Sequence, residues 1–205
     1  MGLNVVKYAD LVSRMARDIP NFDYQDTLEA LRDAGREFCN TSEAWYENLT
    51  AINIVADQQS YALSTDYPAH FKRVKSVHIL SSTDVTNGAD GRLMDSSYYK
   101  LVLPATLKFK VNHTPSTAVT GGLVVEVVFA PNMNSTELPA WFMSRWGDGI
   151  IGKAMYELLK LQDVNKAGLF LNQYHAKLSE AMVETMDDIT PYVGSSDVQV
   201  QEYTP

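Results

Sequence analysis

Residues 42–79 read SEAWYENLTAINIVADQQSYALSTDYPAHFKRVKSVHI, and within this stretch the hydrophobic pattern changes from that of a helix to that of strands. Up to Phe38 the apolar residues recur at spacings of three and four, which is typical of an amphipathic helix. After Trp45 the period becomes two, because Ile52 and Ile54 alternate with polar neighbours as on a half-buried strand. We therefore expect a helical part of the chain to pass into a sheet at Trp45.

Further strands are predicted along the middle of the chain. Ile52–Ile54 and Tyr61–Leu63 flank a turn at residues 57–59, so we expect them to pair as a hairpin. Lys75–Ile79 is expected to form a third strand. Residues 81–91 are dense in turn formers and predict a surface loop or a hairpin tip.

Two stretches with clean alternation, Leu107–Val111 and Leu123–Phe129, complete the predicted strands. On adjacent antiparallel strands, Glu126 could pair with Lys108 or Lys110. The alternative is that the three charges are solvated separately on an outer face.

Two helices are predicted before the strands. The first spans Tyr8–Arg17, and the second begins after Asp23, a residue type suited to the N-cap. Gly35 interrupts the second helix, where a glycine costs about 1 kcal/mol relative to alanine. We therefore expect a neighbouring element to approach the chain closely at Gly35.

Two more helices are predicted after the strands. Pro139 suits the first turn of the third helix. The apolar stripe of this helix runs from Trp141 to Leu161. Glycines interrupt the stripe and indicate tight packing against another helix. These glycines are Gly147, Gly149 and Gly152. The fourth helix is expected to be capped by Asp163 and to carry an apolar stripe that includes Leu169 and extends to Met186.

The order of these elements predicts an α+β fold. We expect a helical bundle of two N-terminal and two C-terminal helices, with an inserted antiparallel β-sheet or sandwich module and an extended C-terminal arm. The expected boundaries are 1–48 for the N-terminal helices, 49–130 for the β module, 131–189 for the C-terminal helices and 190–205 for the arm.

The charge of the chain limits the classes of partner. Its 205 residues include 25 acids and 17 bases, a formal net charge of −8. A protein that holds nucleic acid by bulk charge needs a basic face, so that class is disfavoured, whereas an acidic wall would suit a protein past which DNA slides. The longest apolar runs fall far short of the ~20 residues that a membrane span needs, and no membrane partner is expected.

No constellation of catalytic residues is visible, so we expect a protein that is not an enzyme and has no cofactor or metal. The histidines His70, His78, His113 and His175 are scattered without metal-ligand spacing. Cys39, the single cysteine, lies near the end of an amphipathic helix and is expected to be a small buried side chain.

Three segments resemble the head-to-tail adaptor, or connector, proteins of tailed bacteriophages. They are residues 36–79, the YYKL segment at 98–101, and FAPNMNSTELPAWFMSRWGDGIIGKAMYELL at 129–159. Within them, the strand pattern Q-x-Y-x-L begins at Gln59, the pattern R-V-x-x-V begins at Arg73, and Leu138-Pro139 opens a long helix. These are patterns of a fold and contain no catalytic signature.

The resemblance implies a structural virion protein. Such proteins form a ring, commonly of twelve copies, beneath the portal, where they extend the DNA channel and provide a docking surface for tail or nozzle proteins. It implies the neck of the virion as the location, after assembly in the host cytoplasm. The acidic C-terminal arm, with Val198, Val200 and Tyr203 as anchors, is expected to bind the portal.

Two alternatives remain open at this point. A ligand-binding β module, for example for glycans, would need exposed aromatic residues on the sheet, such as Tyr61, Tyr98 and Tyr99. A hydrolase would need Cys39 to act as a nucleophile beside a distant histidine.

Overall fold

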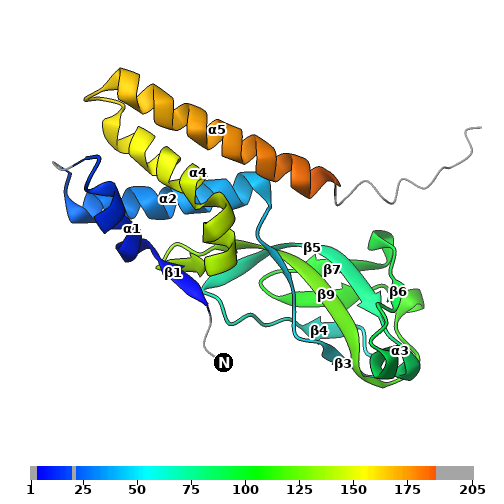
Figure 1. Cartoon of the computed structure of the whole chain (residues 1–205). Coiled ribbons are helices and arrows are strands. Elements are labelled where there is room, and N and C mark those ends of the chain that lie inside the picture. Colours follow the sequence, from blue (N-terminus) through cyan, green and yellow to red (C-terminus); the bar gives the residue numbers. More distant parts are fainter. Residues whose placement is uncertain (1–3, 20–21, 188–205) are drawn as a thin grey trace, which may run out of the picture.

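The computed structural model describes residues 4–19 and 22–187, which form an α+β protein with five α-helices and antiparallel strand pairs (Figure 1). The predicted class and the antiparallel sheets are confirmed. The helices are α1 Tyr8–Met15, α2 Tyr24–Ser42, α3 Ser82–Asn87, α4 Ala140–Leu159 and α5 Val164–Asp187. The strands are β1 Val5–Lys7, β2 Tyr46–Asn48, β3 Ile52–Ile54, β4 Ser60–Ala62, β5 Ala69–Ile79, β6 Arg92–Leu93, β7 Tyr99–Val102, β8 Thr106–Phe109, β9 Val119–Pro131 and β10 Glu137–Pro139, and two 3-10 turns, η1 and η2, span Ser96–Tyr98 and Val111–His113.

The helices begin where the sequence places their caps. The Asp23 carboxylate accepts a hydrogen bond from the Gln25 N–H at 2.7 Å, which satisfies one of the backbone donors left unpaired at the start of α2. The Asp163 carboxylate accepts from the Lys166 N–H at 3.0 Å at the start of α5. Both predicted caps are therefore confirmed.

Gly149 and Gly152 allow α4 to approach α5 closely, as predicted, whereas Gly147 faces only Met143 of α4 itself. A Cβ at Gly149 would lie 2.8 Å from Cβ of Lys177 in α5, and one at Gly152 would lie 2.9 Å from the carbonyl oxygen of Phe170. Gly35 of α2 lies against the phenol ring of Tyr8 in α1. Helix α4 therefore packs between α2 and α5 at distances that larger residues would not permit (Figure 1).

Three details of the C-terminal helices differ from the sequence prediction. Pro139 is the N-cap of α4 and not a first-turn residue, because it ends strand β10. Helix α4 ends at Leu159, so Leu161 lies exposed in the turn before α5. Trp141 and Leu169 belong to the predicted apolar stripes but are 42% and 70% exposed, because their helix faces point away from the bundle.

Strand β9 is the centre of the largest sheet. This thirteen-residue strand pairs with β5 along nearly its whole length and with both β2 and β3 on its other side, which gives the order β2-β9-β5-β6 with β3 also on β9. A second sheet has the order β4-β8-β7. Both sheets contribute to one hydrophobic core and together form a curled half-barrel.

The predicted hairpin between Ile52–Ile54 and Tyr61–Leu63 is wrong. Strand β3 pairs with β9, whereas β4 pairs with β8 in the other sheet. The turn between them does form, with Asp57 at φ 59°, but the Asp57 N–H bonds to the carbonyl oxygen of Pro115 at 2.9 Å. The segment thus crosses from one sheet to the other. The prediction failed because alternation identifies a strand without identifying its partner.

The predicted pairing of Glu126 with Lys108 or Lys110 is also wrong. Glu126 lies in β9 opposite Ser76 of β5, and its carboxylate is 3.7 Å from Nζ of Lys75. Lys108 belongs to β8 in the other sheet. Both lysines are exposed on that sheet, away from Glu126.

Residues 81–91 form the tip of a hairpin, as predicted. They connect β5 to β6 and contain the short helix α3, which the Ser81 hydroxyl and the Asp84 carboxylate close with reciprocal hydrogen bonds of 3.2 and 2.7 Å.

Two short strands missed by the sequence connect the start of α1 to the start of α4. Strand β1 pairs antiparallel with β10, with Val6 opposite Leu138. The Tyr8 N–H bonds to the Thr136 carbonyl oxygen at 3.0 Å, and the Ala140 N–H to that of Asn4 at 2.9 Å. Val5 and Val6 are adjacent apolar residues with no alternation, and Pro139 counts against a strand in β10, so the sequence gives little signal for this clasp.

Candidate functional site

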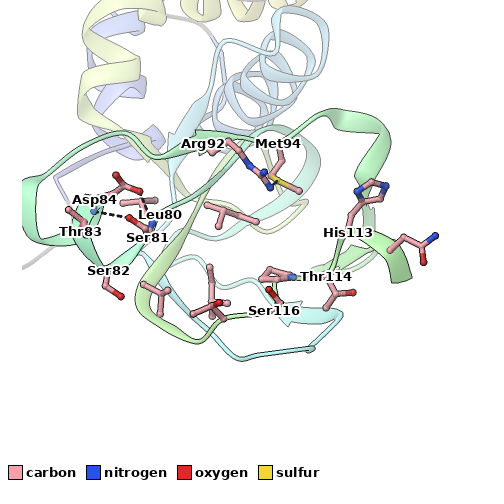
Figure 2. A pocket seen from close by; sticks show the side chains of 16 residues that line it. Leu80, Ser81, Ser82, Thr83, Asp84, Arg92, Met94, His113, Thr114 and Ser116 are labelled. Carbon is pink, nitrogen blue, oxygen red and sulfur yellow. Dashed lines mark hydrogen bonds between the residues drawn. The ribbon is translucent and has the colours of Figure 1, made fainter.

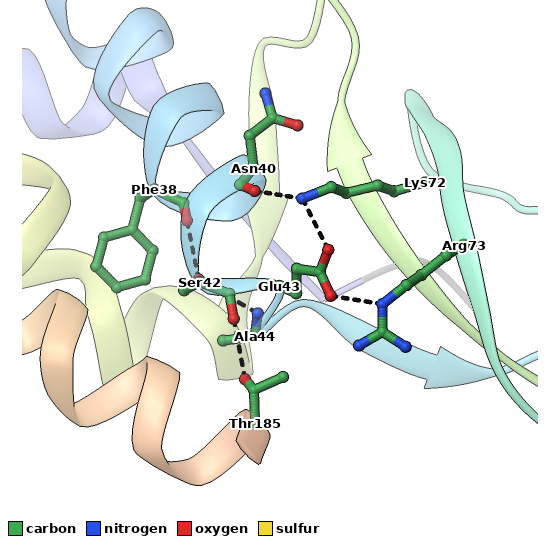
Figure 3. Close-up of polar contacts among 8 residues, drawn as sticks. All are labelled: Phe38, Asn40, Ser42, Glu43, Ala44, Lys72, Arg73 and Thr185. Carbon is green, nitrogen blue, oxygen red and sulfur yellow. Dashed lines mark hydrogen bonds and ion pairs between the residues drawn. The ribbon is translucent and has the colours of Figure 1, made fainter. Parts of the chain in front are cut away.

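The helical part and the sheet meet at the end of α2, where the backbone turns at Glu43. Glu43 has φ 55°, a left-handed conformation that non-glycine residues seldom adopt, and its N–H bonds to the Cys39 carbonyl oxygen at 3.1 Å. Its two carboxylate oxygens contact Nζ of Lys72 at 2.9 Å and Nε of Arg73 at 2.5 Å, both from β5 (Figure 3). Lys72 also donates to the carbonyl oxygen of Asn40. The side chain of Glu43 therefore attaches strand β5 to the end of α2.

The pKa of Glu43 reflects these contacts. Partial burial acts to raise the pKa of the carboxyl, but hydrogen bonds and charge from Lys72 and Arg73 outweigh it and hold the pKa below its ordinary value. Glu43 is therefore ionised at neutral pH, and both ion pairs are present.

Helix α5 is attached to the same junction. The Thr185 hydroxyl in its last turn donates to the carbonyl oxygen of Ser42 at 3.0 Å (Figure 3). The Ser42 hydroxyl donates to the Phe38 carbonyl oxygen at 2.8 Å and accepts from the Ala44 N–H at 3.2 Å. Because all these groups are buried or partly buried, the end of α2, the end of α5 and the segment that leads into β2 hold one another in place.

Trp45 fills the space beneath this junction. It is 1% exposed, and its ring lies 5.5 Å from that of Phe129 in β9 and 6.2 Å from that of Phe142 in α4. Its indole N–H donates to Glu47 at 3.2 Å, and the exposed Trp141 donates to the same oxygen at 3.0 Å. Trp45 thus connects the helical core to the sheet core, as the opening sequence stretch predicts.

A cleft with a volume of about 750 Å³ lies at the opposite end of the sheet (Figure 2). Its apolar lining includes Ile54, Leu80 and Met94, and hydroxyl groups surround it. These hydroxyls belong to Ser81, Ser82, Thr83, Thr114, Ser116 and Thr117. The cleft offers hydrogen bonds and apolar contact.

The ionisable residues that line this cleft already interact with other residues. The Asp84 carboxylate accepts a hydrogen bond from the Ser81 N–H in the α3 cap, and hydrogen bonding from Ser81 lowers the pKa of this carboxyl, while the His113 ring stacks on Tyr98 at 3.6 Å. The Arg92 guanidinium contacts Sδ of Met94 at 3.4 Å. No nucleophile–base pair is assembled among the described residues that line the cleft.

Cys39 is completely buried, and burial raises the pKa of its thiol well above the ordinary value. The prediction of a small buried side chain is confirmed, and a thiolate nucleophile at this position is disfavoured. His70 and His175 are exposed, and the part of the chain that the structure describes contains no group of three residues suited to a metal ion.

The tyrosines required by the glycan hypothesis do not form an exposed platform. Tyr61 is buried and its hydroxyl donates to the Val55 carbonyl oxygen at 3.1 Å. Tyr99 is also buried, and Tyr98 is covered on one face by His113. The observation on which this alternative depends is therefore absent from the described sheet.

The predicted portal-binding residues Val198, Val200 and Tyr203 lie outside the described residues. The junction around Glu43 was not singled out as a site in the sequence. Two signals could have indicated it: an acidic residue directly after a predicted helix, and two adjacent bases at Lys72 and Arg73 in a strand that follows.

In this protein a helical bundle is attached through a buried tryptophan and a forked ion pair to a curled sheet. The chain belongs to the SU10 adaptor protein family, whose model matches residues 6–197, and this is a phage head-to-tail adaptor family. The resemblance inferred from sequence is therefore confirmed. No curated protein matches the chain, and among the described residues no helix has the length and apolar character to cross a membrane.

Proposed function

We propose that this protein is the head-to-tail adaptor of its phage and that it forms a ring of twelve copies beneath the portal. The ring extends the DNA channel and gives the tail or nozzle proteins a surface on which to dock. Membership of a phage adaptor family over residues 6–197 is the observation that carries this proposal.

The junction around Glu43 supports a mechanical role. A ring that connects two other assemblies must hold its upper and lower contact surfaces in a fixed arrangement. This requires that the helices and the sheet of each copy do not move independently. The ion pairs of Glu43, the bond from Thr185 to Ser42 and the buried Trp45 all restrict such motion.

Apolar residues on the outer row of α5 support burial by a neighbour. Leu169 and Val183 are 70% and 59% exposed, and Met186 is exposed one turn later. Residues seven apart lie nearly on one helix face, so positions 169, 176 and 183 form a continuous row. We propose that a neighbouring copy covers this row in the ring.

The charge of the chain fits passage of DNA. A net charge of −8 gives a channel wall that repels the phosphate backbone and does not hold it. In this proposal the DNA is a passing partner with no sequence-specific contact, the protein acts at the virion neck, and assembly takes place in the host cytoplasm.

The division of the chain into residues 1–48, 49–130, 131–189 and 190–205 is part of the proposal. The third unit completes the helical bundle begun by the first, and the fourth is an arm that attaches to the portal through Val198, Val200 and Tyr203. The family match ends at residue 197, so these three residues lie beyond it.

Native mass spectrometry tests the proposal. The protein is measured alone and after mixing with a portal ring from the same phage, and we expect one copy to add per portal subunit. A protein that stays monomeric and ignores the portal would refute the adaptor function. Deletion of residues 193–205 is expected to leave the fold intact and to weaken attachment to the portal, and undiminished attachment would refute the role of the arm.

A further inference from the structure

The outer face of the three-stranded sheet carries a cluster of lysines. Lys100 of β7 lies directly opposite Lys108 of β8, and Lys110 follows two residues later on the same face. The alternate residues Tyr99, Leu107 and Phe109 point into the core, so all three lysines are exposed. We call Lys100, Lys108 and Lys110 the lysine face.

Like charges directly opposite each other on neighbouring strands repel, and the lysine face has little opposing charge of its own. Among the ion pairs of the described residues, none involves Lys100, Lys108 or Lys110. Asp95 is the nearby acid: hydrogen bonds from Ser97 lower the pKa of its carboxyl, and Lys110 lowers it further. In a protein with a net charge of −8, such a face is suited to an anionic partner.

The lysine face is also partly apolar. A groove of about 400 Å³ runs beside it, and its exposed apolar lining consists of Val111 together with the aliphatic stems of the lysines. Val111 is 72% exposed at its edge. A phosphate backbone has no apolar group to place there, so the groove favours a polypeptide with both acidic and apolar side chains.

The C-terminal arm of this chain has that composition. Residues 188–205, DITPYVGSSDVQVQEYTP, contain Asp188, Asp197 and Glu202 and no base, and Val198, Val200 and Tyr203 lie among the last two acids. The part from Val198 onward lies beyond the family match. The arm is therefore complementary to the lysine face in charge and in apolar character.

The arm also has sufficient reach. It follows α5, whose last turn is bonded to Ser42 at the point where the chain enters the sheet. Eighteen extended residues span at most ~60 Å, whereas β9, the longest strand of the sheet, measures about 43 Å at 3.3 Å per residue. The extended arm is therefore longer than the longest strand of the sheet.

We propose that the lysine face is the docking site of the acidic C-terminal arm in the free protein, with acids of the arm on the lysines and an apolar arm residue in the groove. This goes beyond the adaptor function, because it concerns the protein before it meets any partner. Docking on this face competes with attachment of the arm to another protein.

Zero-length carbodiimide cross-linking of the full-length protein, followed by mass spectrometry of the peptides, tests the proposal. This reagent joins an amine to a carboxylate in contact with it. We expect links from Asp197 or Glu202 to the lysine face at low salt, and their loss at high salt, where the Debye length falls to about 3 Å. Links spread evenly over all exposed lysines, or no links from the arm, would overturn the proposal.

A double variant, Lys100→Ser with Lys108→Ser, provides the second measurement. The link from the arm to the remaining Lys110 should fall about tenfold, the factor expected from two lost exposed ion pairs. The matched control is Lys7→Ser, which removes an exposed lysine from strand β1 and should leave that link unchanged. An equal effect of both variants would overturn the proposal.

Two further outcomes separate this proposal from other possibilities. If a short DNA duplex binds the wild type but not the double variant, and the arm gives no links, the face binds nucleic acid and the proposal is wrong. Portal binding is measured separately. Links from the arm to the lysine face in a protein that does not bind the portal would support arm docking and refute the adaptor function. Portal binding without such links would support the adaptor function and refute arm docking.

Discussion

Replacing Trp45 with alanine should be one of the most destabilising single changes in this protein. The indole is 1% exposed and contacts the cores of both the helices and the sheet. Truncation of a buried Trp or Phe to Ala costs about 3–5 kcal/mol, as the sum of lost burial and the cavity left behind. In a chain of this length we therefore expect the melting temperature to fall by roughly 6–20 °C.

Trp141 provides a matched control. Its indole N–H donates to the same Glu47 oxygen, at 3.0 Å compared with 3.2 Å for Trp45, but its side chain is 42% exposed. Trp141→Ala removes an indole and one hydrogen bond without opening a core cavity, so we expect a cost of about 1 kcal/mol. The difference between the two variants measures the contribution of burial at the junction.

Urea unfolding followed by far-UV circular dichroism measures both free energies without relying on tryptophan fluorescence. The midpoint should shift strongly for Trp45→Ala, slightly for Trp141→Ala, and the slope should remain constant for both. If the two variants lost stability equally, Trp45 would not be the core connection between helices and sheet, and the account of the junction would be refuted.

Three other predictions concern single positions. Because folding lowers the pKa of Glu43, its stabilising contribution is complete above the unfolded pKa of about 4.3 and is lost as the pH falls through the lower folded pKa. The free energy of unfolding of the wild type should therefore exceed that of Glu43→Gln by a constant amount near neutrality and by a smaller amount in acid. A difference that grew in acid would contradict the ion pairs. Gly149→Ala should lower the free energy of unfolding by about 1–3 kcal/mol, because the new Cβ would lie 2.8 Å from Cβ of Lys177. Gly168→Ala, whose Cβ would have no atom within 4 Å, should be neutral or stabilise α5 by up to about 1 kcal/mol. Cys39 should react with a thiol reagent only after unfolding, because the thiol is fully buried, and rapid reaction of the native protein would show that α2 opens locally.

The sequence predicts the helices of this protein well because their signals are local. Asp23 and Asp163 identify the caps within one turn, and Gly149 and Gly152 indicate a close neighbour since a glycine inside a helix needs a reason. The change of period at Trp45 likewise locates the passage into the sheet.

Strand pairing could not be predicted in the same way. Ile52–Ile54 and Tyr61–Leu63 are correctly identified as strands, but each pairs with a strand more than forty residues away in sequence, Ile54 with Val119 and Tyr61 with Leu107. Nothing within a three-residue strand specifies such a partner. The Glu43 junction was missed for the same reason, because its ion pairs join a helix end to a strand that begins much later.

The clasp between β1 and β10 has a consequence for synthesis on the ribosome. Helix α2 ends at Ser42, but α4, against which it packs, begins only at Ala140, directly after β10. At about 5–20 residues per second, translation leaves the apolar stripe of α2 without its partner for roughly 5–20 s. During that interval β1 also has no strand to pair with, so the nascent chain exposes both an apolar helix and a bare strand edge.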